Sequence, residues 1–216
     1  MNFEDARAQM VEQQVRAWEV LNDRVLDIFR EVPREAFVPQ RYQKLAFADT
    51  SIPLPHGQCM MTPKMEGRLL QALELEPSDF VLEIGTGSGF FTACLAKLGG
   101  SVVSADIYPD FPEQAAPRLK KLGIQNVTLE CWDATQMDVQ NRFDAIAVTG
   151  SIAEYDRRFE RALKLGGRLF IIVGQEPVME AFLVTRLTET EWNRDVRFET
   201  VIAPLVNAHQ PEKFVF

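Results

Sequence analysis

Residues 81–91 of the chain read VLEIGTGSGFF, an apolar run followed by three alternating glycines, Gly85, Gly87 and Gly89. Glycine adopts positive φ without strain and lets another molecule approach the backbone closely. A helical pattern begins directly after the turn, and a helix N-terminus presents unpaired backbone N–H groups. The stretch therefore predicts a strand, a tight ligand-binding turn and a helix.

Short apolar runs alternate with helical patterns on the C-terminal side of this turn. Including the turn itself, strands are expected at 80–84, 101–107, 127–131, 143–149 and 168–173, and helices at 91–98, 111–122 and 155–163. Such alternation is typical of a parallel sheet with helices on both faces. Two further strands, at 184–187 and 198–205, are expected to form an antiparallel edge. The predicted fold class is α/β and doubly wound, with an N-terminal helical extension.

Before residue 80 the pattern is one of helices and loops. Apolar residues recur at helical spacing as far as Pro33. The members of this stripe are Val11, Val15, Trp18, Leu21, Val25, Ile28 and Val32. Thr62 and Pro63 then resemble an N-cap followed by proline at the first helical position. We expect residues 1–79 to form a helical extension and loop, packed on the same domain as a ligand-binding core of residues 80–216.

Composition limits the possible functions. The 216 residues carry 23 Lys and Arg against 31 Asp and Glu, a net charge of −8, which argues against binding nucleic acid. With two His and no CxxC pair among Cys59, Cys94 and Cys131, we expect no metal site and reduced thiols. No secretory signal or membrane-spanning segment is recognised. The sequence predicts a cytoplasmic protein without a membrane partner and leaves its oligomeric state open.

The acidic residues around the turn indicate the ligand. The spacing GxGxG differs from the GxGxxG fingerprint of dinucleotide-binding proteins. Glu83 lies two residues before the first glycine, where a carboxylate suits a ligand with a cationic group. Asp106 and Asp133 end the next two strands, at the sheet edge where ligands bind, and Asp106 is placed to accept hydrogen bonds from a ribose. S-adenosylmethionine (AdoMet), which carries a sulfonium, an α-ammonium and a ribose, fits this pattern.

Residues 83–89, EIGTGSG, resemble motif I of class I AdoMet-dependent methyltransferases. A narrower resemblance, to the protein-L-isoaspartate O-methyltransferase family, rests on five segments in the same order and extends from about residue 9 to about residue 206. The segments are VPREAFVP (32–39), AFADTSIPLPHGQ (46–58), VLEIGTGSGF (81–90), FDAIAVTGSI (143–152) and LKLGGRLFIIVG (163–174).

The resemblance implies a mostly parallel, Rossmann-like sheet of seven strands, an N-terminal helical lid and AdoMet as cofactor. It also implies methyl transfer to the α-carboxylate of L-isoaspartyl and D-aspartyl residues in damaged proteins, after which the ester collapses to a succinimide. The partners are then isoaspartyl-containing peptides or proteins. The positions expected to bind the cofactor are Gln58, Cys59, Met60, Glu83, Gly85, Thr86, Gly87, Gly89, Asp106, Ile107, Asp133, Ala134 and Thr149.

One departure concerns the methyl acceptor. The family typically reads GQTIS, one residue and Pro, with the Ser as its active residue, whereas GQCMMTP at 57–63 places Met61 there. A thioether cannot donate a hydrogen bond to a substrate carboxylate. Thr62 offers a hydroxyl one position later, although it also suits the N-cap of the next helix. An alternative stays open: an AdoMet-binding paralogue without isoaspartyl repair activity, serving a small-molecule acceptor or regulation.

Methyl transfer to a carboxylate needs no general base from the chain. A carboxylate with an ordinary pKa of about 3.9 is ionised at neutral pH. Catalysis then rests on alignment and on exclusion of water, so the scarcity of histidine is compatible with the reaction. Other methyltransferase classes fit less well, because the chain has neither a [D/N]PP[Y/F] segment after its fourth expected strand nor a Pro-Cys nucleophile.

Overall fold

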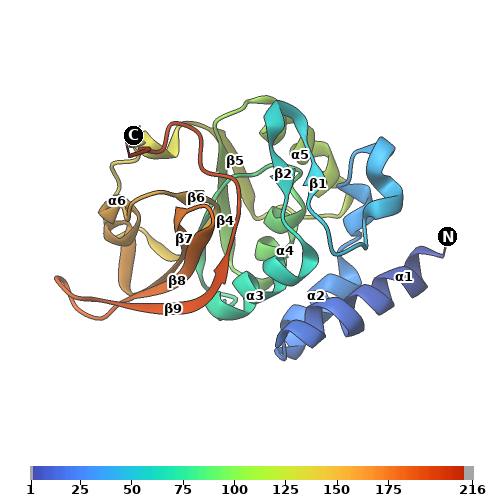
Figure 1. Cartoon of the computed structure of the whole chain (residues 1–216), viewed down its shortest axis with the longest axis horizontal. Helices are drawn as coiled ribbons and strands as arrows, with labels where there is room; N and C mark the ends of the chain where they lie inside the picture. The colour runs from blue at the N-terminus through green and yellow to red at the C-terminus, as the bar shows by residue number, and fades with distance from the viewer. Residues whose placement is uncertain (1, 212–216) are drawn as a thin grey trace.

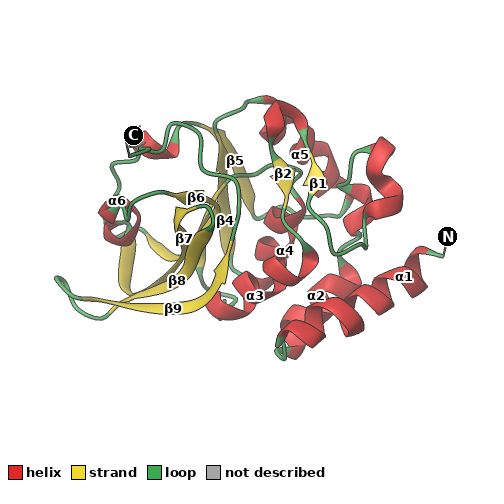
Figure 2. Cartoon of the chain, viewed as in Figure 1, coloured by secondary structure: helices red, strands yellow, loops and turns green. Residues whose placement is uncertain are grey.

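A seven-stranded sheet forms the centre of the computed structural model, which describes residues 2–211 (Figure 1 and Figure 2). The strand order is β5-β4-β3-β6-β7-β8-β9. The first five strands in this order are parallel, and the last two are antiparallel. The strands are β3 (Phe80–Ile84), β4 (Ser101–Asp106), β5 (Val127–Cys131), β6 (Phe143–Ile152), β7 (Leu163–Gln175), β8 (Val178–Arg186) and β9 (Trp192–Thr200). The predicted doubly wound, mostly parallel α/β sheet is confirmed.

Helices cover both faces of the sheet because successive strand residues point to opposite sides. Val81 and Val102 pack in a cluster with α3 (Pro63–Leu73), α4 (Phe90–Leu98) and α5 (Asp110–Lys121). Leu82 and Val103 pack on the other face with Phe159 of the short helix α6 (Arg157–Arg161). The strands are therefore apolar on both sides, as a buried parallel sheet requires.

Several predicted elements have different bounds in the structure, among them one helix and one strand near the C-terminal side of the sheet. The helix expected at 155–163 is limited to α6, because Leu163 already pairs with Phe143 as the first residue of β7. The strand expected at 198–205 is wrong at its end, since β9 stops at Thr200. The following residues run beside β6 instead: the Ser151 amide donates to the Ala203 carbonyl at 2.9 Å, and Leu205 N to the Ser151 carbonyl at 2.8 Å.

The N-terminal helices lie beside α3 and α4 (Figure 1). Helix α1 (Phe3–Met10) continues into a π-helical turn (Val11–Val15) and a 3-10 turn (Arg16–Trp18), and α2 spans Asp23–Glu31. The predicted stripe is buried except at two places: Leu21 is 67% exposed and Trp18 is 47% exposed. The placement of Leu21 on a helix is wrong, because Asn22 caps α2 by accepting from Arg24 N, which leaves Leu21 in the turn.

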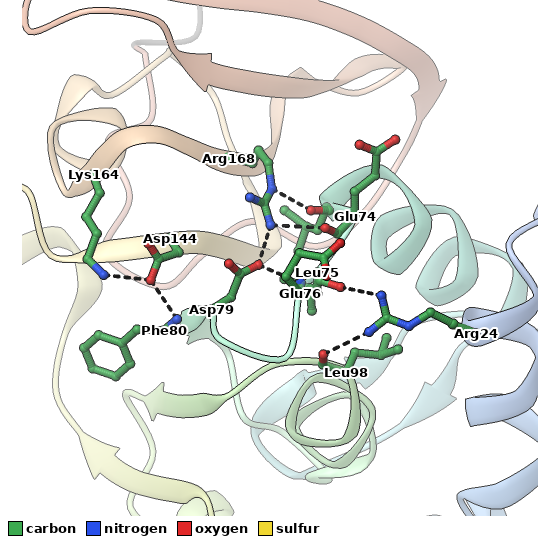
Figure 3. Close-up of polar contacts among 11 residues, drawn as sticks. Arg24, Glu74, Leu75, Glu76, Asp79, Phe80, Leu98, Asp144, Lys164 and Arg168 are labelled. Carbon is green, nitrogen blue, oxygen red and sulfur yellow. Dashed lines mark hydrogen bonds and ion pairs between the residues drawn. The ribbon is translucent and has the colours of Figure 1, made fainter.

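The loop between α3 and β3 is held from two sides by arginines (Figure 3). Arg24 of α2 donates to the carbonyls of Leu75 at 3.0 Å and Leu98 at 3.4 Å. Arg168 of β7 donates to the Leu73 carbonyl at 2.7 Å and forms an ion pair with Asp79. These contacts join the expected N-terminal extension, residues 1–79, to the expected core, residues 80–216. The division of the chain at residue 79 stays a prediction.

Candidate active site

The candidate site lies where the chain reverses its direction across the sheet. From β3 the chain proceeds outward to β4 and β5 and then returns to β6 on the other side, which opens a crevice at the carboxyl ends of these strands. A cavity occupies this position. The predicted site residues that line it are Gln58, Cys59, Gly85, Gly87, Asp106, Ile107, Asp133, Ala134 and Thr149.

The glycine turn is shaped by a close approach from β6. Gly85 has φ +100°, and a Cβ atom there would lie 2.2 Å from Thr149 Oγ1. Thr149 Oγ1 donates to the Ile84 carbonyl at 2.8 Å, which fixes the turn against β6. Gly89 is a packing position, since a Cβ there would lie 2.7 Å from the Ala115 Cβ, and it does not line the cavity. The turn thus presents bare backbone to the cavity, as an adenosyl ligand requires.

Asp106 stands at the end of β4 with its acceptor capacity half used. Its Oδ2 accepts from Gly87 N at 3.0 Å and its Oδ1 from Tyr108 N at 3.1 Å. Burial raises the pKa of Asp106, and these backbone N–H groups oppose the shift. A carboxylate has about four lone-pair positions. Two therefore stay available, which fits the predicted pair of hydrogen bonds from a ribose.

Asp133 caps the short helical turn that follows β5. It accepts from Thr135 N at 2.8 Å, and Asn207 Nδ2 donates to it at 2.8 Å. Burial alone would raise the pKa of Asp133, but the hydrogen bonds from Asn207 and Thr135 outweigh burial and lower its pKa. Asp133 is thereby ionised and connects the cavity wall to the segment that follows β9.

Glu83 does not reach the cavity, contrary to the prediction. Its side chain is fully buried, and Oε2 accepts from Thr92 Oγ1 and Ser104 Oγ, each at 2.5 Å. Oε1 is also buried and has no hydrogen-bond partner among the described residues. Burial raises the pKa of Glu83 to about 8. The residue is then mostly protonated at neutral pH and cannot neutralise a cationic ligand directly.

A smaller cavity adjoins the first and shares Gly85, Gly87 and Thr149 with it. Predicted residues Met60, Met61 and Thr86 line this smaller cavity. Thr86 is itself held by a hydrogen bond of 2.7 Å between its Oγ1 and Ser104 Oγ. The apolar Met60 and Met61 therefore lie against the glycine turn, where they exclude water.

A buried ion pair supports the Met61 backbone. Arg34 Nη2 donates to the Met61 carbonyl at 2.7 Å, and Nη1 donates to Glu66. Burial raises the pKa of Glu66 to about 7, with Arg34 acting against the shift. Glu66 also lines the smaller cavity. Sequence reasoning missed this carboxylate, although spacing was a usable signal: Glu66 lies three and seven residues before the buried Leu69 and Leu73, on the same face of α3.

Thr62 occupies the N-cap position of α3, but its side chain makes no capping hydrogen bond. With Met61 it lines a third cavity, of about 300 Å³, which we call the Trp18 cavity. The residues of the Trp18 cavity are Trp18, Ser51, Met61, Thr62, Lys64, Met65, Arg68 and residues 198–202. Thr62 therefore lines the Trp18 cavity, and its neighbour Met61 lines both this cavity and the smaller cavity at the glycine turn.

Several cavity residues were missed by sequence reasoning. Tyr108 and Trp132 flank the predicted acids Asp106 and Asp133, so their position at strand ends was a signal that could have found them. Residues 202–206 also line the main cavity, and they reach it only through the tertiary path after β9. No sequence periodicity indicates such a path.

His56 closes one side of the site. Its ring stacks on Tyr108, with centroids 4.0 Å apart and planes 6° from parallel. Its Nε2 lies 2.8 Å from Asp110 Oδ1 at the start of α5. The turn before β2 (Cys59–Met60) is thus attached to the turn after β4, and Gln58 and Tyr108 from these two regions line the cavity.

Residues 2–211 contain neither a membrane-spanning helix nor a cluster of metal-ligating side chains. None of the helices there has the length and apolar character needed to cross a bilayer. Within the same residues, no three or more His, Cys, Asp or Glu side chains gather as a metal ion would require.

Comparison with known proteins identifies the family. A family model described as protein-L-isoaspartate(D-aspartate) O-methyltransferase matches residues 5–210. The chain is 31% identical to the protein-L-isoaspartate O-methyltransferase of Petrotoga mobilis, over 97% of this chain and 99% of that protein. It is 35% identical to the protein of the same name in Rhodopseudomonas palustris, over 94% and 95% of the two chains.

A solved structure has the same fold. It is assigned as a protein-L-isoaspartate O-methyltransferase of Plasmodium falciparum and was crystallised with S-adenosyl-L-homocysteine. It superposes with a TM-score of 0.79 at 20% identity and covers 95% of this chain and 98% of its own. Given the family match over nearly the whole sequence, the chain belongs to the protein-L-isoaspartate(D-aspartate) O-methyltransferase family.

Proposed function

We propose that this protein is an AdoMet-dependent carboxyl O-methyltransferase that esterifies isoaspartyl residues of damaged proteins. The observation that carries the proposal is the family match over residues 5–210, which includes every residue lining the main cavity. Relatives bearing the name protein-L-isoaspartate O-methyltransferase, and a structural neighbour crystallised with S-adenosyl-L-homocysteine, support the same activity and cofactor.

The residues of the main cavity suit each part of the cofactor. The bare backbone at Gly85 and Gly87 permits close contact, and Asp106 keeps two acceptor positions for the ribose hydroxyls. Asp133 and Ala134 line the side where the adenine belongs. When bound, AdoMet supplies a methyl group activated by the sulfonium.

The remaining task of the chain is to align an acceptor that is already ionised. A carboxylate with a pKa of about 3.9 needs no proton removed at neutral pH. Met60 and Met61 are almost fully buried and exclude water beside the glycine turn. Removing water from a carboxylate and holding it in line are both sources of rate acceleration.

The cytoplasm is the compartment in which we propose that the protein acts. Cys59, Cys94 and Cys131 are all free thiols. Unpaired cysteines are typical of reducing compartments.

Labelled AdoMet tests the proposed function. An isoaspartyl peptide and its normal aspartyl twin are incubated with the chain, and base-labile methyl ester is counted. We expect ester on the isoaspartyl peptide alone. Absence of ester on both peptides would reject the proposed function.

Met61 favours a second candidate, an AdoMet-binding paralogue that serves a small-molecule acceptor. Its side chain cannot donate a hydrogen bond to a carboxylate, and it lines two cavities. Calorimetry with S-adenosylhomocysteine (AdoHcy) separates the candidates: binding of AdoHcy without any peptide ester supports the paralogue. Met61→Ser tests the apolar acceptor wall, and unchanged turnover of isoaspartyl peptide by this variant would exclude a role for Met61.

A further inference from the structure

The Trp18 cavity is built from four segments that are distant in sequence. Trp18 comes from the N-terminal helical region, Ser51 from the loop that follows it, Met61 and Met65 from the segment that leads into and begins α3, and Phe198 from β9. Its volume of about 300 Å³ lies at the lower end of the range for small-ligand pockets, about 300–1,000 Å³. The large side chains of its walls are mainly apolar or aromatic, so the cavity suits an apolar group.

The Trp18 cavity adjoins the candidate active site. Met61 lines both the Trp18 cavity and the smaller cavity at the glycine turn. Ile202 lines both the Trp18 cavity and the main cavity. A molecule that enters the Trp18 cavity is therefore separated from the cofactor site only by side chains that both cavities share.

Two cations surround the Trp18 cavity although the chain carries a net charge of −8. Lys64 Nζ lies 4.2 Å from the Trp18 ring centroid, and Arg68 Cζ lies 4.1 Å from the Phe198 ring centroid. Lys64 Nζ also donates a hydrogen bond to Asp49 Oδ2 at 2.8 Å. Arg68 is paired with Glu19 at 4.0 Å, and Glu199 also lines the cavity, so these contacts hold both cations over aromatic rings within a rim of mixed charge.

Exposed apolar surface gathers at the same place. Trp18 is 47% exposed and Val201 is 49% exposed, and both line the cavity. Burial of such surface against an apolar side chain stabilises a complex at about 25 cal/mol per Å². The cavity thus combines large apolar side chains, a rim of mixed charge and a wall, Met61, that it shares with the smaller cavity at the glycine turn.

We propose that the Trp18 cavity receives the residue next to the acceptor carboxylate and selects substrates with a large apolar side chain there. The inference rests on the proposed function and names a specificity that the family name does not contain. Trp18 supplies the selective wall, and Lys64 and Arg68 lie over the rings of Trp18 and Phe198 at its rim.

Two isoaspartyl peptides test the inference, identical except that both neighbours of the isoaspartate are leucine in one and serine in the other. We expect the wild-type chain to prefer the leucine peptide about tenfold in kcat/KM, through KM, which corresponds to about 1.4 kcal/mol. Calorimetry on AdoHcy-saturated protein should give the same ratio of dissociation constants. Trp18→Ala should reduce both ratios to about one.

Leu165→Ala is the matched control, because Leu165 is also an exposed large apolar residue, 67% exposed, and lies outside the Trp18 cavity. It should keep the tenfold preference. Equal kcat/KM for the two peptides, or equal losses on both in Trp18→Ala, would overturn the inference alone. Ester on neither peptide overturns the proposed function and the inference with it. A preference that survives Trp18→Ala while the variant changes sedimentation would assign the surface to a second copy and also overturn the inference.

Discussion

Two buried glutamates behind the glycine turn differ in what balances their burial. Glu66 faces the guanidinium of Arg34, whereas Glu83 accepts hydrogen bonds only from the hydroxyls of Thr92 and Ser104. A hydroxyl stabilises a carboxylate less than a guanidinium does. The pKa of Glu83 is accordingly raised further, to about 8, than that of Glu66, at about 7.

Glu83→Gln should flatten the pH dependence of stability. The folded-state pKa of about 8 lies above the ordinary 4.5, so Glu83 favours the folded state at low pH and loses this contribution as pH rises through 8. Between pH 5 and 8 we expect the wild type to lose roughly 1 kcal/mol per pH unit relative to the variant. Urea unfolding at several pH values measures the difference, and parallel curves would show that Glu83 is not a source of it.

Gly85→Ala should abolish tight cofactor binding. Alanine at φ +100° is strained, and its Cβ would meet Thr149 Oγ1 at 2.2 Å, so the turn has to move away from β6. Gly123→Ala is the control, because its φ is +71° and nothing lies within 4 Å of the added Cβ. We expect AdoHcy to bind Gly85→Ala at least tenfold more weakly by calorimetry and to bind Gly123→Ala like wild type. Similar affinities of the two variants for AdoHcy would contradict the role of the Gly85 turn in binding the cofactor.

One side chain, His56, joins two elements at the site. His56 belongs to the turn before β2 (Cys59–Met60), which pairs with β1 (Ile52–Pro53). Its stack on Tyr108 and its contact with Asp110 attach this small hairpin to the turn between β4 and α5. The hairpin is therefore a wall of the cavity whose position depends on one aromatic contact.

His56→Ala should speed release of the cofactor product. Loss of an aromatic stack is worth about 0.5–1.5 kcal/mol, or about two- to tenfold in rate if the contact must break before AdoHcy leaves. Trp132 lines the cavity and reports dissociation by fluorescence in stopped flow. His209→Ala is the control, since the His209 side chain is 74% exposed. Equal dissociation rates in the two variants would contradict the role of His56.

The sequence predicted those parts of the site that depend on local order. Strand, glycine turn and helix follow one another directly, so Gly85, Gly87 and Asp106 were found from spacing and strand ends. Glu83 was misplaced although its environment follows from alternation: it shares a sheet face with Val81, and that face is covered by α4. Leu21 was misplaced because an Asn cap restarts the helix after it.

At the scale of the molecule, the N-terminal extension and the sheet share one hydrophobic cluster. Residues from α1 and α2 pack in the same cluster as α4 and the β3–β4 face. Arg24 and Arg168 fix the connecting loop from opposite sides (Figure 3). The two parts were expected to pack on one domain, but residue spacing alone could not identify these contacts. The extension and the core each have a complete apolar pattern of their own.

Unfolding should therefore be a single transition. A probe at Trp18 in the extension and one at Trp192 in β9 should report the same urea midpoint, because neither half can expose its side of the shared cluster alone. Tryptophan fluorescence of Trp132→Phe/Trp192→Phe and Trp18→Phe/Trp132→Phe chains, which keep one tryptophan each, measures the two ends separately, with circular dichroism for the whole. Midpoints that differ within one variant between the two methods would indicate independent units.

Residues 202–206, which cross the main cavity beside β6, have a consequence for biosynthesis. A ribosome makes a chain from its N-terminus, so all seven strands of the sheet have been synthesised before this segment emerges. A chain that stops after β9 would keep every strand of the sheet and lack one wall of the main cavity. Such a truncated product should fold and should bind the cofactor poorly.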